Sequence, residues 1–155
     1  MEESDRLERE ISRLVTAINK IDGAYYFCAR RMSLRENTLA LLYALHDGQP
    51  HTQKQIVEDW LIPKTTINTA VRELKREGYL ALTPLPHSRE KALVLTEAGR
   101  EHFGGMLARL RAAEQEALCH TLAEYPPEFV DAFDHFAQRL CQTLEERILN
   151  NSDKT

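Results

Sequence analysis

The middle of the chain alternates apolar stripes with residues that start or stop helices, and this pattern constrains the fold more than any other feature. Ser33–Glu36 and Thr52–Gln55 each place a hydroxyl residue three positions before Glu or Gln, which is the pattern of a capping box at a helix start. The first box predicts a helix, capped by the serine, that ends near Gly48. The second predicts a short helix that ends before Pro63.

A third helix is predicted over Lys64–Glu77, because apolar residues recur there at helical spacing. Pro63 is tolerated at the first helical position, and Gly78 suits a left-handed cap. Two strand patterns follow, Tyr79–Thr83 and Lys91–Thr96, and a long polar tip separates them. The order helix, short helix, helix, hairpin is that of a winged helix-turn-helix. This fold places its second helix in a DNA major groove and brings the hairpin to the backbone or minor groove.

Long helices are predicted on both sides of this region. The first thirty residues carry apolar side chains at steps of three and four, Thr96 is placed to cap another helix, and Pro126-Pro127 separates that helix from a last one. The last helix has one continuous apolar stripe, formed by Phe129, Phe133, Phe136, Leu140, Leu144 and Ile148. The predicted fold class is therefore mostly α (α+β), with a small hairpin.

One small winged domain cannot cover the stripes of both terminal helices, so we expect a homodimer. We expect Leu14, Ile18, Phe133, Phe136, Leu140 and Leu144 to be buried between subunits or against the dimer helices. The predicted organisation is a helical dimerisation region at 1–32 and 99–150, a winged helix-turn-helix DNA-binding region at 33–98, and a frayed tail at 151–155.

The net charge of −4 argues against a general polyanion binder, but the charge is uneven. Residues 54–91 hold seven Lys or Arg and five Asp or Glu, a balance of +2, which leaves −6 for the rest of the chain. A locally basic segment in an acidic chain is a typical electrostatic footprint for nucleic acid. The predicted third helix also has no carboxylate in its first two turns.

Side chains on that face suit base reading, since Thr and Asn reach base edges and Arg pairs with guanine or phosphate. The candidate DNA-binding residues are Thr52, Gln53, Lys64, Thr65, Thr66, Asn68, Thr69, Arg72, Arg76, Arg89 and Lys91. The expected partner is double-stranded, palindromic operator DNA, because a twofold dimer places two recognition helices about one DNA turn apart, ~34 Å.

The sequence lacks the signatures of several other classes. It contains no Gly-rich phosphate loop, no nucleophile elbow and no His-Glu-x-x-His, so we predict no enzymatic activity, no cofactor and no metal, although a zinc site assembled from distant residues stays open. No apolar run is long enough for a membrane span, the acidic start has no signal pattern, and three cysteines are too few for a disulfide framework. These features predict a cytoplasmic protein without a membrane partner.

The chain resembles the MarR-type transcriptional regulators. The resemblance is carried by Thr52–Ile56, by Lys64–Asn68 with Leu74 and Gly78, and by Leu95–Gly99, which is similar to the family's Leu-Thr-x-x-Gly after the wing. It implies a homodimer whose terminal helices build the interface, with the winged domains beneath them, and it implies repression more than activation. Two positions depart from the family pattern: His87 stands where the wing usually has Asp, and Thr69 stands where many members have Arg.

The resemblance also implies a small aromatic or phenolic effector that releases the DNA. Tyr25 and Tyr26 lie near the end of the first helix, and Arg30 is placed to hold a carboxylate, although an aromatic cluster at this spacing is also typical of a core. Two alternatives stay open. Cys28, beside two arginines that would favour a thiolate, suggests a redox-sensing regulator, unless it is a buried inert thiol. A winged-helix module that binds proteins rather than DNA is the other.

Overall fold

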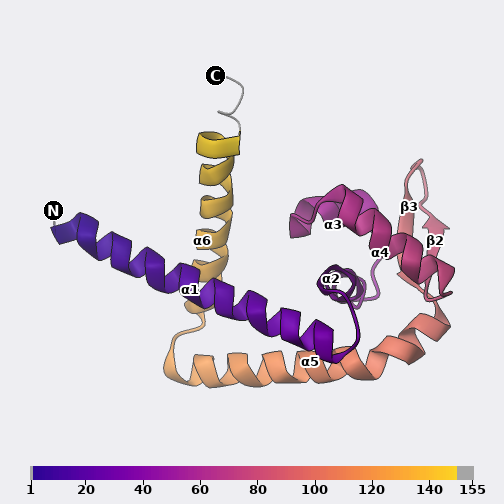
Figure 1. The fold of residues 1–155 in the computed structure, drawn as a ribbon, viewed down its shortest axis with the longest axis horizontal. Helices are drawn as coiled ribbons and strands as arrows, with labels where there is room; N and C mark the ends of the chain where they lie inside the picture. The colour runs from indigo at the N-terminus through magenta and orange to yellow at the C-terminus, as the bar shows by residue number, and fades with distance from the viewer. Residues whose placement is uncertain (1, 150–155) are drawn as a thin grey trace. The chain divides into compact units, whose positions relative to one another are not determined.

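The computed structural model describes residues 2–149, so the tail predicted at 151–155 lies outside the described residues. The chain divides after Ala108 into two compact units (Figure 1). The first unit contains, in order, α1 (Glu2–Arg31), α2 (Glu36–Ala44), β1 (His51–Thr52), α3 (Gln53–Trp60), α4 (Lys64–Arg76), β2 (Leu80–Pro84), β3 (Lys91–Leu95) and the first part of α5 (Glu97–Glu124). The second unit contains the rest of α5, α6 (Glu128–Leu144) and a π-helical turn, Glu145–Leu149.

The expected wing is present as an antiparallel sheet in which β3 lies between β1 and β2. Leu82 of β2 and His51 of β1 both pair with Leu93 of β3. The two-residue strand β1 is not predicted by the sequence, because a pair of residues has no recognisable alternation and its only support is the distant strand β3. The fold is otherwise the predicted one: mostly helical, with a helix-turn-helix followed by a hairpin.

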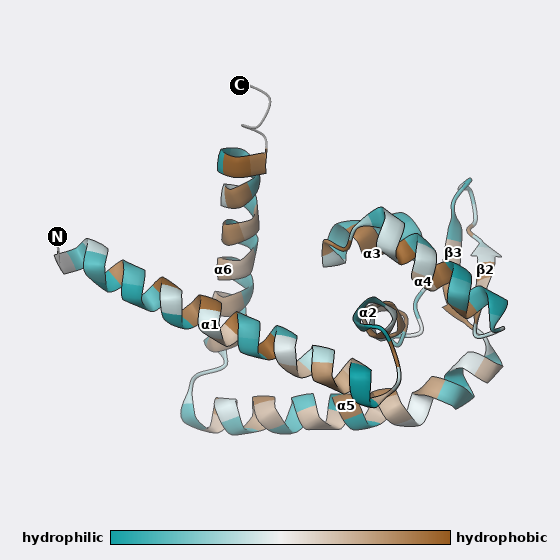
Figure 2. Cartoon of the chain, viewed as in Figure 1, coloured by the Kyte–Doolittle hydropathy of each residue, from teal (hydrophilic) through white to brown (hydrophobic). Residues whose placement is uncertain are grey.

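The core of the first unit draws on every element of the winged helix-turn-helix. Its largest fully buried side chains are Leu41, Leu42, Ile56, Ile67, Leu93 and Leu107. They come from α2, α3, α4, β3 and α5, so this set of apolar residues fixes the positions of α3, α4 and the wing. Burial of each such side chain stabilises the fold by about 1.5–3 kcal/mol. In Figure 2, α2 carries a hydrophobic run of this core.

Two predicted helix starts are confirmed in atomic detail. The Thr52 hydroxyl accepts a hydrogen bond from the backbone N–H of Gln55, and the Gln55 side chain accepts one from the Thr52 N–H, which completes the capping box. At α5, the Thr96 hydroxyl accepts a hydrogen bond from the N–H of Gly99 at 3.1 Å. The predicted end of α4 at Gly78 is also confirmed. Gly78 takes the predicted left-handed conformation, at φ +80°, directly after the C-cap residue Glu77.

The capping box predicted at Ser33 is wrong. Ser33 has φ +57°, its N–H bonds to the Arg30 carbonyl, and the Leu34 N–H bonds to the Ala29 carbonyl. These two bonds form a Schellman motif, so the serine closes α1 and cannot open α2. Helix α2 begins instead at Glu36, with an extended Arg35 at the cap position. Pro63 likewise caps α4 rather than occupying its first turn.

Gly99 allows α5 to approach the start of the wing. A Cβ built on Gly99 lies 2.2 Å from the carbonyl oxygen of Tyr79, which is too close for any side chain. The same carbonyl accepts the N–H of Thr96 at 3.0 Å, and the Thr96 hydroxyl donates to the Gly78 carbonyl at 2.7 Å. The Leu-Thr-x-x-Gly run therefore joins the end of α4, β2 and α5 through backbone contacts.

The terminal helices keep apolar side chains exposed within one chain. On α6, Phe129 and Phe133 stack with ring centroids 6.2 Å apart, yet they remain 43% and 38% exposed. Other large exposed apolar residues on these helices are Leu7, Ile11, Leu14, Val15 and Ile21 on α1, Leu118 and Leu122 on α5, and Leu144 on α6. Figure 2 shows the apolar residues of α6 along its length. From the sequence, residues 1–32 and 99–150 are assigned to one dimerisation region. Because such a region would form between two chains, this assignment stays a prediction.

Candidate nucleic-acid interface

Helix α4 has one buried face and one polar face. Ile67, Ala70, Val71 and Leu74 are buried against the rest of the winged helix-turn-helix. Lys64, Thr65, Asn68 and Arg72 are exposed on the other side. The spacing of the buried residues at steps of three and four forces this division, since residues four apart lie on the same helical face. A polar helical face without carboxylates in its first two turns is thereby presented to solvent.

The cations of this face are not neutralised by neighbouring carboxylates. Within residues 2–149, neither Lys64 nor Arg72 takes part in an ion pair or side-chain hydrogen bond. The first carboxylate of α4, Glu73, accepts a hydrogen bond from Arg35 at 2.9 Å. This ion pair ties the middle of the recognition helix to the start of α2 and draws the Glu73 charge away from the polar face. The face therefore keeps a net positive charge.

Two polar side chains of α4 are already held by hydrogen bonds. The side-chain amide of Gln53 donates to the Asn68 carbonyl oxygen, which links α3 to α4. The Thr69 hydroxyl donates to the Thr65 carbonyl at 3.1 Å. A methyl group is a suitable partner for thymine, and an oriented amide is a suitable partner for adenine.

The remaining residues predicted for α3 and α4 differ in accessibility. Thr66 is half-buried, whereas Arg76 is exposed and lies 3.9 Å from the Glu77 carboxylate. Thr52 is only 4% exposed, and its hydroxyl is occupied by the cap of α3. Thr52 therefore has a structural role as the cap of α3, whereas the side chains of Thr66 and Arg76 remain at least partly accessible.

The wing presents a second group of cations. Arg89 lies in the loop between β2 and β3, Lys91 begins β3, and both are exposed. His87, which replaces the usual Asp of the family, has φ +59°, a region in which Asn, Asp and His are enriched among non-glycine residues. The Ser88 hydroxyl accepts the Glu90 N–H at 3.0 Å and holds the turn next to Arg89. The loop is therefore shaped by its own backbone and Ser88.

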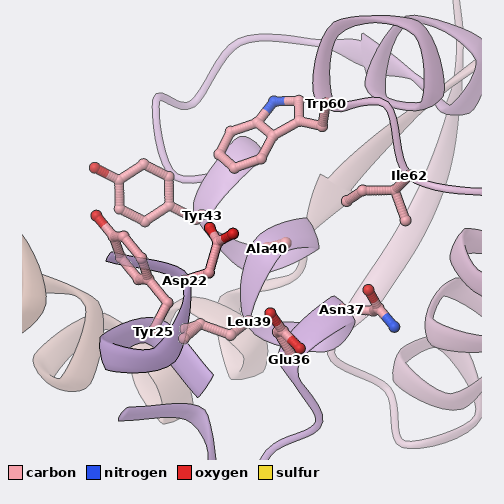
Figure 3. A pocket seen from close by; sticks show the side chains of 9 residues that line it. All are labelled: Asp22, Tyr25, Glu36, Asn37, Leu39, Ala40, Tyr43, Trp60 and Ile62. Atoms are coloured by element: carbon pink, nitrogen blue, oxygen red, sulfur yellow. The ribbon is translucent and has the colours of Figure 1, made fainter. Parts of the chain in front are cut away.

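The predicted effector residues do not converge. Tyr25 lines a cavity of about 340 Å³, but Tyr26 and Arg30 are not among its lining residues (Figure 3). Tyr26 makes an edge-to-face contact with Phe27, while Arg30 lies by a shallow depression together with Cys28. Adjacent residues of a helix project about 100° apart, and for this reason the sequence cluster separates in space.

The other residues of the cavity carry no signal that sequence reasoning could have found. They are Asp22, Glu36, Asn37, Leu39, Ala40, Tyr43, Trp60 and Ile62. They come from α1, α2, α3 and the turn after α3, and no local pattern joins these segments. Among these residues, Trp60 stands out most in the sequence, because it is a large aromatic residue three positions before the helix break at Pro63.

The three cysteines and the other possible metal ligands lie as follows. Cys28 is a half-buried free thiol on α1, and Cys119 and Cys141 are exposed free thiols. Between residues 2 and 149, no group of three or more His, Cys, Asp or Glu side chains is arranged to hold a metal ion. None of the helices in that range combines the length and apolar character that a membrane span requires.

Comparison with known proteins adds an independent line of evidence. Residues 34–89 match the sequence profile of the MarR family. The uncharacterised HTH-type transcriptional regulator YwoH of Bacillus subtilis is 25% identical over 103 residues, which cover 66% of this chain and 72% of that protein.

Solved structures resemble the whole fold. The MarR family regulator NMB1585 of Neisseria meningitidis is 26% identical, with a TM-score of 0.71 over 92% of this chain and 99% of that one. A Staphylococcus aureus MarR in complex with salicylate and kanamycin is 15% identical, with a TM-score of 0.59 over 90% and 93%. The chain therefore shares its architecture with these regulators over most of its length.

Proposed function

We propose that this chain, a MarR-type winged-helix transcriptional regulator, binds operator DNA as a homodimer and is released from it by a small-molecule ligand. The observation that carries the proposal is the exposed polar face of α4, whose cations Lys64 and Arg72 are unpaired within the described residues. An unneutralised positive face on the second helix of a helix-turn-helix is complementary to the phosphates and base edges of a major groove.

The proposal gives different roles to the two ends of this face. The start of α4 points free backbone N–H groups outward, and with Lys64 it suits a phosphate. Asn68, Thr69 and Arg72 lie one and two turns further, and in this proposal they contact base edges. In the same proposal, Arg89 of the wing contacts backbone phosphate or the minor groove. The helix thus positions the protein at its start and reads sequence from its middle.

Dimerisation is supported by the apolar faces that one chain leaves exposed. Along the stripe that begins on α6, Phe129, Phe133, Leu144 and Ile148 remain exposed, and on α1 so do Leu7, Ile11, Leu14, Val15 and Ile21. Exposed apolar stripes of this length mark helix–helix interfaces. Sedimentation at micromolar concentration should give a mass near twice 17.9 kDa, and a monomer at that concentration would contradict the proposed assembly.

A test of DNA recognition first selects a preferred duplex from a random pool, and then compares variants on that duplex and on random DNA at fixed salt. Arg72→Ala should cost about 1–3 kcal/mol on the selected duplex and less on random DNA, because it removes a base contact. Lys64→Ala should lower both affinities together, because a phosphate contact carries no sequence information. Lys20→Ala, an exposed cation on α1, is the matched control and should change neither.

Two results would contradict the proposal. A pool that yields no enriched duplex would favour the protein-interaction module instead. An enriched duplex whose preference over random DNA is unchanged in Arg72→Ala would remove that residue from base reading and leave Asn68 and Thr69 as the readers.

Ligand release is supported by the cavity beside α2, and a structurally similar Staphylococcus aureus MarR is itself in complex with small molecules, salicylate and kanamycin. Since the cavity is lined both by α1 and by the turn that leads into α4, a ligand there contacts the dimerisation helix and the DNA-reading helix-turn-helix at once. A repressor that loses its operator when this cavity fills is the regulatory scheme we propose.

A further inference from the structure

The cavity beside α2 has an unusual combination of lining residues. It has a volume of about 340 Å³, and its walls come from α1, α2, the end of α3 and the turn before α4 (Figure 3). Two of the lining side chains are carboxylates, Asp22 and Glu36, and three are aromatic, Tyr25, Tyr43 and Trp60. None of the lining residues is Lys, Arg or His.

The aromatic side chains present ring surface to this space. Tyr43 and Trp60 meet edge to face, with ring centroids 5.8 Å apart and planes at 63°. Trp60 remains 42% exposed, so a large part of its indole is available for contact. Figure 3 shows Asp22 and the rings of Tyr25, Tyr43 and Trp60 among the side chains that line this cavity.

From this lining we infer that the cavity binds an organic cation that carries an aromatic or apolar group, such as a quaternary ammonium or a protonated aromatic amine. Aromatic faces attract cations through their quadrupole, and the two carboxylates add direct charge attraction. Leu39, Ala40 and Ile62 supply an apolar surface for the rest of the ligand. An effector with a carboxylate or phenolate would instead meet two negative charges and no cationic partner. The ligand class is a property of the cavity, whereas its regulatory effect rests on the proposed function.

Two structural links connect the cavity to the recognition helix. Trp60 and Ile62 flank Leu61, which takes φ +49° in the turn that leads into α4. A ligand that displaces the indole therefore acts on the turn that sets where α4 begins. Glu36 directly follows Arg35, whose guanidinium holds Glu73 of α4 at 2.9 Å. In both links, a residue that lines the cavity lies within a few sequence positions of a residue that contacts or leads into α4, the helix proposed to read DNA.

Trp60 is the only tryptophan in the sequence, so intrinsic fluorescence excited at the indole reports on this cavity. The full-length protein is titrated with benzyltrimethylammonium, with neutral benzyl alcohol and with anionic benzoate, which share a phenyl ring and differ in charge. We expect a saturable change with the cation, at an affinity at least tenfold above that for either of the other two. Benzoate binding as tightly as the cation would overturn the inference.

Charge-neutralising variants test whether the two carboxylates set this preference. Asp22→Asn and Glu36→Gln should each raise the dissociation constant for the cation about fivefold, because two unit charges a few ångströms apart attract by this order even in water. The affinity for benzyl alcohol should stay the same, which shows that the cavity is intact. Asp59→Asn removes a carboxylate next to Trp60 that does not line the cavity, and it is the matched control. A double variant, Asp22→Asn with Glu36→Gln, that keeps full affinity for the cation would overturn the inference.

The same proteins are tested for DNA binding, which separates this inference from the proposed function. A cation-selective Trp60 signal in a protein that binds no duplex would refute the proposed function and support the ligand class. Duplex binding without any cation preference would refute the ligand class alone. Where both hold, benzyltrimethylammonium should weaken duplex binding in the wild type, and the double variant should require at least tenfold more of it.

Discussion

Replacing Gly99 by alanine tests the joint between the wing and α5. In the helix interior, alanine is normally favoured over glycine by about 1 kcal/mol. At Gly99, however, the new methyl would lie 2.2 Å from the Tyr79 carbonyl oxygen, and ordinary contacts begin above 3.4 Å. Relief of this overlap requires a backbone shift of about 1 Å, because neither atom belongs to a flexible side chain.

The shift has a cost that the neighbouring contacts define. The Tyr79 carbonyl would move away from the Thr96 N–H, which it accepts at 3.0 Å, and loss of such a bond costs about 1–3 kcal/mol. The Tyr79 ring is held between His102 and Phe103, with centroids 4.6 and 5.1 Å away, so the strand cannot move freely. After the propensity gain of about 1 kcal/mol is subtracted from this cost, we expect Gly99→Ala to lower the free energy of unfolding by about 1 kcal/mol.

Gly105→Ala is the matched control, because it lies in the same helix and a Cβ there meets nothing within 4 Å. It should raise the free energy of unfolding by about 0.5–1 kcal/mol. Both variants are compared with the wild type by urea unfolding at one fixed protein concentration, since the proposed dimer would make stability depend on concentration. If Gly99→Ala is as stable as Gly105→Ala, the close approach at Tyr79 is not what requires glycine, and the reasoning is refuted.

Two other outcomes follow from the described contacts. Thr52→Ala should lower the free energy of unfolding by about 1 kcal/mol in the same urea assay, because it removes the helix cap. Thr52→Ser keeps the hydroxyl and should therefore retain most of the wild-type stability. Equal losses in both variants would show that the methyl group of Thr52, and not its cap, provides the stability. Arg89→Ala should weaken binding to all duplexes alike and reduce the slope of log affinity against log salt by about one. Fluorescence anisotropy at several salt concentrations measures both effects. An unchanged affinity would mean that the wing with His87 does not reach DNA.

The sequence by itself determined the elements whose signals are local. The cap at Thr52, the stop at Gly78 and the apolar spacing of α4 each depend on residues within four positions of one another. For the same reason the polar face of α4, with Lys64 and Arg72, follows from the sequence alone, because helical periodicity decides which residues share a face. These signals were sufficient to predict a helix-turn-helix with a wing.

Features that join distant segments were decided only by the tertiary structure. Strand β1 exists because His51 pairs with Leu93, and the requirement for Gly99 comes from the carbonyl of Tyr79, twenty positions away. Ser33 shows how the end of one helix can override a start signal for the next, since its backbone completes the hydrogen bonds of α1.

The cavity beside α2 is the clearest case of such long-range determination. Asp22, Glu36 and Trp60 carry no shared motif, and they line one space only because α2 packs against α1 and the helix-turn-helix at the same time. Sequence periodicity fixes the face on which a side chain lies, but it does not fix which faces meet. The packing of whole elements decides that, because the burial of apolar surface has no preferred direction and is maximised over the entire domain.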